Sequence, residues 1–303
     1  MAHNHSHKHH EHHHHHDVGN IRVAFFLNLS FTVIELIGGL LTNSIAIISD
    51  AVHDFGDSLS LGLAWYFQGL AKKGSNERYS YGYKRFSLLG AIVNSLVLTI
   101  GSIFILYEAV PRIFAPQATD AQGMFWLAVL GIIVNGMAAL RVKKGASSIN
   151  ERVVSLHLLE DVLGWAAILV GSIVMYFFDC PVIDPILSIG ISCFVLFNVV
   201  RNIRDTLHII LQRSPQEIDI PGITNKIKQL ENVESIHDLH VWAMDENYNV
   251  LTVHILVNQS LTMEQLACLK MQIRELLQEE QIQHATIEFE APGELCRMED
   301  CVH

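Results

Sequence analysis

The stretch SDAVHDFGDSLSLGLAW, residues 49–65, places three aspartates and one histidine in a segment that otherwise resembles a membrane-spanning helix. A second stretch, VVSLHLLEDVLGWAA, residues 153–167, carries one histidine, one glutamate and one aspartate in the same kind of setting. Each Asp at the centre of a spanning helix costs about 2.5 to 3.5 kcal/mol on insertion. Ionisable side chains at such positions therefore indicate a functional site.

The composition is that of a membrane protein. Of 303 residues, 50% are hydrophobic and only 17% are charged, which is too apolar for an ordinary soluble domain. The formal net charge of -11 argues against nucleic acid as a partner, because phosphates require a basic surface. The odd number of cysteines, five, argues against a disulfide scaffold.

Six segments are long and apolar enough to span a bilayer, which takes about 20 residues. They are residues 21–41, 46–70, 86–110, 124–140, 153–178 and 182–200. The connections on one side are rich in Lys and Arg, whereas those on the other side hold only Arg112. Since cytoplasmic loops collect basic residues, we expect both termini to be cytoplasmic.

The chain changes character after the sixth span. The order of helical and alternating patterns predicts an αββαβ domain, of the ferredoxin-like or metallochaperone-like α+β type, with strands at 234–244, 248–257 and 284–290. We therefore expect three parts. These are a His-rich cytoplasmic tail at 1–17, a six-helix membrane domain at 18–208 and a cytoplasmic αββαβ domain at 209–303.

The spacing of the intramembrane residues predicts one shared site. His53 and Asp57 are four residues apart, as are His157 and Asp161, so each pair lies on one helix face. At about 1.5 Å per residue, the two pairs reach overlapping depths near the midplane of the bilayer. Two antiparallel helices could thus close a site of four ligands. Asp50, Asp54 and Glu160 either belong to the same functional cluster or are solvated near helix ends.

Two imidazoles and two carboxylates at tetrahedral spacing favour Zn²⁺, with Co²⁺ and Cd²⁺ as close competitors. The occupied site would be electrically neutral, whereas the empty carboxylates would be costly in a low-dielectric setting unless protonated. We therefore expect metal and protons to compete for the site. Five further polar residues inside the spans are expected to bond between helices or to line the pathway: Asn28, Glu35, Asn94, Glu108 and Asn135.

The six spans, the two HxxxD helices, the loop ERYSYGYKRFSLLGAIVN and the αββαβ domain together resemble the cation diffusion facilitator family, in its zinc-transporting branch. The resemblance covers the chain beyond about residue 18. It implies a homodimer, without a prosthetic group, that exports Zn²⁺ from the cytoplasm in exchange for protons by alternating access. The short loops suit a bacterial inner membrane.

The resemblance also implies metal between the cytoplasmic domains. By the family pattern, one ion lies on His237, His254 and Glu290. A possible second ion would take its ligands from another set: His240, His284, Cys296 and Cys301. In a regular strand His237 and His240 point to opposite faces, which suits separate sites.

Two other classes of function remain. An intramembrane zinc hydrolase needs an open coordination position and a general base, often as HExxH. None of the six predicted spans contains this motif, so we do not expect an enzyme. A membrane zinc sensor would need only the soluble domain. The histidines before residue 17 are interpreted as a native tail that gathers metal, with a purification tag as the alternative.

Overall fold

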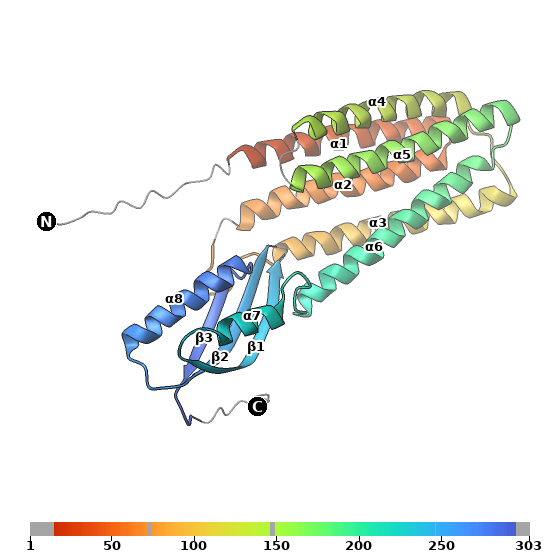
Figure 1. Cartoon of the computed structure of the whole chain (residues 1–303). Helices are drawn as coiled ribbons and strands as arrows, with labels where there is room; N and C mark the ends of the chain where they lie inside the picture. Colours follow the sequence, from red (N-terminus) through yellow and green to blue (C-terminus); the bar gives the residue numbers. More distant parts are fainter. Residues whose placement is uncertain (1–14, 72–73, 146–148, 246, 295–303) are drawn as a thin grey trace. The chain divides into compact units, whose positions relative to one another are not determined.

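The computed structural model describes residues 15–71, 74–145, 149–245 and 247–294, with the side chains of 15–24, 68, 71, 141–145 and 149–157 outside this description. The described residues form two compact units, drawn from Met1–Lys72 with Gly90–Asn202 and from Lys73–Leu89 with Ile203–His303. Each predicted span forms a helix (Figure 1). The long helices are α1 (His15–Thr42), α2 (Ile45–Ala71), α3 (Phe86–Phe114), α4 (Ala121–Gly145), α5 (Ile149–Phe178) and α6 (Ile183–Ile210).

Five of these helices, all except α2, contain described stretches long and apolar enough to cross a membrane. Helix α2 is the exception because Asp50, His53, Asp54 and Asp57 interrupt its apolar sequence. Helix α6 runs ten residues past the predicted span that ends at residue 200, since the change to charged residues ends the apolar stretch and not the helix. Many large apolar side chains on these helices are exposed, as expected for surfaces that face lipid.

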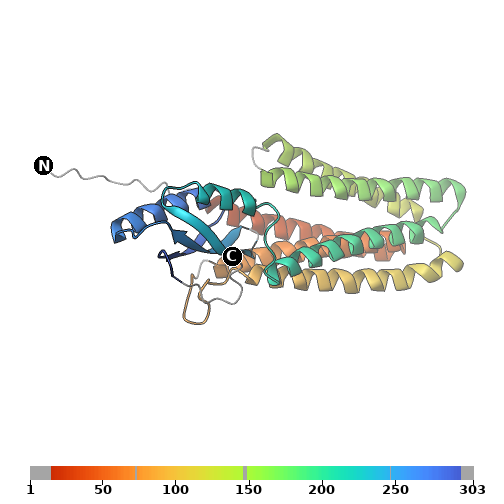
Figure 2. The ribbon, with the colours of Figure 1, turned by 60° about the horizontal axis from the view of Figure 1, so that its bottom comes forward.

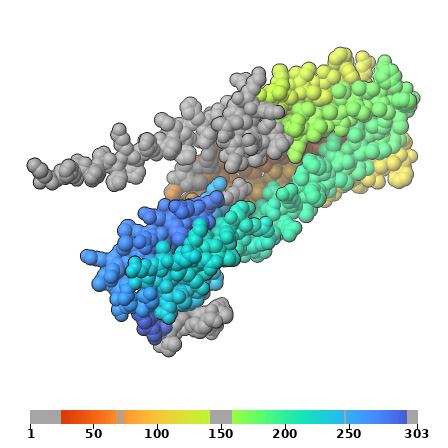
Figure 3. All heavy atoms as spheres, in the orientation of Figure 1, coloured from red at the N-terminus to blue at the C-terminus, as the bar shows by residue number. Residues whose placement is uncertain are grey.

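In the helical unit, α1 packs against α2 and α4, and α4 packs along α5. Figure 2 shows these helices running beside one another from a second direction, and α5 and α6 cover much of the visible face of this unit in Figure 3. Trp165 of α5 lies at the centre of the packing and is buried against Phe31 and Met124. Gly131 of α4 permits this contact, because a Cβ there would lie 2.2 Å from the Trp165 ring.

The second unit is a three-stranded sheet with two helices. Strands β1 (Val233–Asp245) and β2 (Tyr248–Val257) are antiparallel, and β2 pairs in parallel with β3 (His284–Glu290). The parallel pairing requires a crossover, which α8 (Met263–Glu279) supplies, and α7 (Ile220–Lys228) precedes β1. The predicted αββαβ order is therefore confirmed.

Local sequence signals define the two short helices. Asp219 accepts a hydrogen bond from the Gly222 amide at the start of α7, and Thr262 and Gln265 form a capping box at the start of α8. Lys226 of α7 pairs with Glu280, and this hydrogen bond and ion pair raise the pKa of Lys226.

The two faces of the sheet differ in chemistry. Odd-numbered residues of β2, such as Leu251, Val253 and Ile255, are buried with the apolar faces of α7 and α8 in one core. Because side chains alternate along a strand, the even-numbered residues, including His254, belong to the opposite face. The same alternation places Glu290 of β3 on that opposite face, since Ala285, Ile287 and Phe289 pack against the core. The helices thus leave one face of the sheet available for polar side chains.

Candidate metal centres

Helices α2 and α5 bring three ionisable side chains together. His53 and Asp57 lie one turn apart on α2, and their Nε2 and Oδ2 atoms are 3.7 Å apart. Asp161 of α5 faces them, with Oδ1 4.0 Å from His53 Nε2. One ligand atom from each residue lies within 4.8 Å of the other two. A single divalent cation could therefore contact all three.

His157, the fourth predicted ligand of this site, lies in α5 four residues before Asp161. Its backbone is thus about one helical turn from Asp161, on the same side of α5. The side chain of His157 lies outside the described residues. The structure therefore brings together three of the four predicted side chains, and the role of His157 remains a prediction.

The acidic residues near the α2–α5 site differ in their solvent exposure. Asp50 and Asp54 are only 5% and 4% exposed, so the interpretation that they are solvated near helix ends is wrong for these two residues. Glu160 is exposed, as that interpretation requires. Asn28 bonds between helices, as the sequence suggested, because its Nδ2 donates to Asp54 O at 3.1 Å and to Ser58 Oγ at 3.0 Å.

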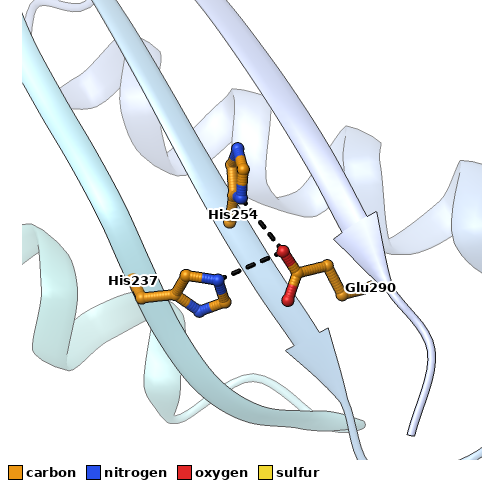
Figure 4. Close-up of side chains that lie close together, drawn as sticks. All are labelled: His237, His254 and Glu290. Atoms are coloured by element: carbon orange, nitrogen blue, oxygen red, sulfur yellow. Dashed lines mark hydrogen bonds and ion pairs between the residues drawn. The ribbon is translucent and has the colours of Figure 1, made fainter. Parts of the chain in front are cut away.

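A second cluster lies on the sheet face that α7 and α8 leave free. His237 of β1 pairs in register with His254 of β2, and Glu290 extends from β3 toward both rings (Figure 4). Glu290 Oε1 is 3.1 Å from His237 Nε2 and 3.0 Å from His254 Nδ1. The three ligand atoms lie within 4.8 Å of one another. The donor set of two imidazoles and one carboxylate fits zinc, which would need one more ligand for a tetrahedron.

Two further carboxylates surround His254 and were not expected from the sequence. Asp238 Oδ2 and Glu288 Oε2 each lie 3.4 Å from His254 Nε2. The His254 side chain is nearly buried, with 7% of its surface exposed. With Glu290 beside Nδ1, both ring nitrogens of His254 face carboxylates. Such contacts fix the orientation of a metal-binding imidazole. Glu288 could have been found from the sequence, since it shares the face of Glu290 by strand alternation.

The expected separation of His237 and His240 onto opposite faces is wrong. A bulge interrupts β1 between them, so that His237 pairs with His254 and His240 pairs with Thr252. These partners are two residues apart on β2 and therefore share a face. Asp238, within the bulge, has the left-handed φ of 47°. His240 is largely exposed, and its Nε2 lies 2.8 Å from Asp238 Oδ1.

His284, another ligand implied for the second cytoplasmic ion, has an aromatic neighbour. Its ring lies edge-on to Tyr81, with 5.5 Å between ring centres. In the same region Lys84 Nζ lies 4.0 Å from the centre of the Tyr248 ring. Tyr81 and Lys84 therefore contact the starts of β3 and β2, respectively. The structure does not group His284 with His240, and Cys296 and Cys301 lie outside the described residues.

Comparisons with known proteins agree with this architecture. The cation efflux transmembrane domain matches residues 21–211, and the cation efflux protein cytoplasmic domain matches residues 215–292. The chain is 34% identical to the cadmium, cobalt and zinc/H(+)-K(+) antiporter of Bacillus subtilis (strain 168), over 96% of this chain and 92% of the relative.

Two further relatives cover the chain to a similar extent. The metal cation efflux system protein CzcD of Cupriavidus metallidurans is 33% identical over 91% of this chain and 87% of its own length. The zinc transporter ZitB of Escherichia coli (strain K12) is 29% identical over 99% of this chain and 96% of its own length. With both domain models matched in order, the chain belongs to the cation efflux family, the cation diffusion facilitators that the HxxxD helices suggested.

Proposed function

We propose that this chain exports Zn²⁺ from the cytoplasm in exchange for protons, by alternating access to one intramembrane site. The observation that carries the proposal is the convergence of His53, Asp57 and Asp161 from two helices within 4.8 Å. His157 would complete a set of two nitrogen and two oxygen donors, and a tetrahedron of this composition suits zinc.

Charge balance explains why such a site would exchange metal for protons. The carboxylates of Asp57 and Asp161 neutralise one divalent cation, so the occupied site carries no net charge. When the ion leaves, two carboxylates remain close together in a poorly solvated place, and protonation lowers that cost. Proton binding would therefore accompany metal release, and metal binding would displace protons.

The names of the relatives support this range of substrates. The Bacillus subtilis protein is named as a cadmium, cobalt and zinc/H(+)-K(+) antiporter, and the Escherichia coli protein as a zinc transporter. Co²⁺ and Cd²⁺ accept the same mixture of nitrogen and oxygen ligands. We therefore propose Zn²⁺ as the main substrate and Co²⁺ and Cd²⁺ as competing substrates.

The orientation in the membrane follows from the basic residues. The connection between α2 and α3 contains Arg78, Lys84 and Arg85, whereas Arg112 stands at the other end of α3. Because Lys and Arg collect on the cytoplasmic side, the connection between α2 and α3 would be cytoplasmic, as would both termini. The membrane would be the inner (cell) membrane of a bacterium, and the bacterial origin of the relatives named above is consistent with this assignment.

The cytoplasmic unit would hold a resident zinc ion on His237, His254 and Glu290. The fit of two imidazoles and a carboxylate around one point supports this assignment. A second ion would use His240, His284, Cys296 and Cys301. The match to the cytoplasmic domain of cation efflux proteins supports assembly as a homodimer through this unit.

Transport in liposomes tests the main proposal. The full chain is reconstituted with a zinc dye and a pH dye inside the vesicles, and the two signals are followed after zinc is added. We expect zinc entry with proton counterflow in the wild type. His53→Ala should reduce zinc entry by about 100-fold or more. Loss of a residue that only hydrogen-bonds to a metal ligand already lowers metal affinity by about 10- to 100-fold, and loss of a ligand should cost more. His208→Ala serves as the control and should transport normally. His208 lies outside the helical unit that holds the proposed transport site, and its ring contacts Arg213 of its own unit.

The outcomes separate the rival functions. Zinc entry without proton counterflow would eliminate the exchange mechanism. Zinc binding without any entry would favour a sensor or binding protein. Faster entry of Cd²⁺ or Co²⁺ than of Zn²⁺ would make one of these ions the main substrate. A hydrolase would require an open coordination position, and a four-coordinate zinc with all four protein ligands, seen by X-ray absorption, would argue against it.

A further inference from the structure

Glu35 of α1 is a buried carboxyl group that the proposed ligand set does not use. It is 1% exposed, and its carboxyl group lies within hydrogen-bond reach of the buried Asp54 carboxyl group. Two carboxyl groups can share a hydrogen bond only when one of them holds a proton. It lies seven residues before the end of α1 at Thr42, and thus about 10 Å inside that end at 1.5 Å per residue. A carboxyl group at this depth whose neighbour is another carboxyl group is costly and indicates a functional role.

The charged groups that act on Glu35 are all acidic. They are Asp54 and Asp50 of α2 and Asp161 of α5. Asp50 is buried as well, and its Oδ2 has no hydrogen-bond partner in the described part of the chain. On the adjoining helices, the described residues 121–140 of α4 contain no titratable side chain, and α2 contains no Lys or Arg, so that His53 is its only basic group. No described cation therefore lies beside Glu35 to balance a carboxylate.

These surroundings determine the charge of Glu35. A carboxylate without a cation in a low-dielectric interior takes up a proton to avoid the cost of a buried charge, and neighbouring carboxylates favour the neutral form further. A divalent cation on His53, Asp57 and Asp161 would reverse this balance, because two positive charges nearby favour the ionised form. Glu35 would therefore hold a proton when the metal is absent and lose it when the metal is bound.

We infer that Glu35 carries a counter-transported proton, at a position beside the metal ligands and separate from them. This inference rests on the proposed exchange of Zn²⁺ for protons. When the metal binds from the cytoplasm, the O–H bond of the Glu35 carboxylic acid breaks and the proton passes to cytoplasmic water. After the metal has left to the outside, the Glu35 carboxylate takes up one proton from the outside. One proton thus crosses through Glu35 for each ion exported, and no electrons are transferred.

The position of Glu35 along the helices supports uptake from the outside. Glu35 and Asp50 lie seven and five residues from the nearer ends of their helices, Thr42 and Ile45. His53 and Asp57 are eight and twelve residues from Ile45, deeper in the membrane by the same count. In the proposed orientation the connection between α1 and α2 faces outward. Glu35 therefore stands between the metal ligands and the outer surface.

The proton count on zinc binding tests the inference. Calorimetric titration of the full chain in detergent, repeated in buffers with different heats of ionisation, gives the number of protons released per zinc bound. Glu35→Gln removes the titratable group and keeps the shape of the side chain. We expect it to release one proton fewer per zinc than the wild type, with a zinc dissociation constant changed less than about tenfold. Glu264→Gln, the same change at an exposed position of α8 outside every proposed site, should leave the count unchanged. An unaltered count in Glu35→Gln would overturn the inference.

An infrared measurement on the wild type decides the matter if Glu35→Gln does not fold. The zinc-free protein at neutral pH should show the carbonyl band of a protonated carboxylic acid, and zinc should abolish it. Glu35→Asp, which keeps the carboxyl group, should shift this band. The absence of the band before zinc is added, or an unshifted band in Glu35→Asp, would overturn the inference. Failure of the proposed function is recognised separately, because the wild type would then exchange no protons for zinc in liposomes.

Discussion

Asp184, in the first turn of α6, caps the first turn of α2. Ser44 Oγ donates to Asp184 Oδ1 at 2.5 Å, and the Ile45 and Ala46 amides donate to the same carboxylate at 2.9 and 3.2 Å. Asp184 is 0% exposed. Because helix N-termini present free amides and a partial positive charge, a carboxylate is favoured there. A helix that carries the proposed metal ligands is thus attached at its start to another helix.

We predict that Asp184→Ala destabilises the folded protein by about 2 to 3 kcal/mol, since the Ser44 hydroxyl and two amides would be left buried without their charged partner. Thermal unfolding in detergent measures the loss. Asp120→Ala is the control, because Asp120 caps α4 through the Gln122 and Gly123 amides at an exposed position and its loss should cost about 1 kcal/mol. Equal losses in the two variants would contradict a special role for Asp184.

Replacing His53 by Asp should broaden metal selectivity. His53→Asp exchanges a nitrogen donor for an oxygen donor, and Mn²⁺ prefers oxygen ligands more strongly than Zn²⁺ does. We expect the ratio of zinc to manganese transport in liposomes to fall, with an altered response to Cd²⁺ as well. An unchanged metal profile would show that His53 does not ligate the ion.

The cytoplasmic cluster should bind zinc independently of transport. Equilibrium dialysis of the full chain should show one zinc ion fewer per chain in His254→Ala than in the wild type. His237 and Glu290 alone would provide too few ligands for tight binding. Zinc at about 100 times its dissociation constant should also stabilise the wild type by about 2.7 kcal/mol through such a site, and this part of the stabilisation should vanish in the variant. The same zinc content in both proteins would argue against the site.

The contact between Tyr81 and His284 gives a way to separate two roles for His284. His284→Phe keeps an aromatic ring against Tyr81 but removes the ligand nitrogens. If His284 holds a second cytoplasmic ion, as proposed, His284→Phe should bind one zinc ion fewer per chain, as should His284→Ala. Retained zinc in His284→Phe, with faster hydrogen exchange of residues 74–85 in His284→Ala alone, would assign the residue to loop packing.

The histidine-rich residues before α1 should tune uptake without being essential. Deletion of residues 2–16 should lower the transport rate at low zinc concentration and leave the rate at saturating zinc unchanged, because a tail of imidazoles raises the local supply of metal but forms no part of the membrane site. Complete loss of transport in liposomes would overturn this expectation.

Residue type and spacing together predicted that side chains of α2 and α5 lie close together. Four residues between His53 and Asp57 place them on one helix face, and the structure has their ligand atoms 3.7 Å apart. The same residues lower the mean hydropathy of α2. A search for spans by hydropathy alone therefore misses this helix, although it carries half of the predicted ligands. Ionisable residues in an apolar pattern were the stronger signal.

Contacts between distant segments could not be predicted in the same way. Asp184 looks like an acidic residue that favours the start of its own helix, and nothing in its local sequence indicates that it caps α2. The contact of Tyr81 with His284 joins residues 203 positions apart in the sequence. Such pairs depend on tertiary packing, which periodicity does not encode.

The bulge in β1 shows how little sequence is needed to alter the surroundings of His254. Regular pairing resumes on both sides of it, with His237 opposite His254 and His240 opposite Thr252. A chain without Asp238 would keep both pairings, because the bulge is one residue of excess length on one strand. In evolutionary terms, the insertion or deletion of a single codon is enough to add or remove a carboxylate beside His254 while the rest of the sheet keeps its register.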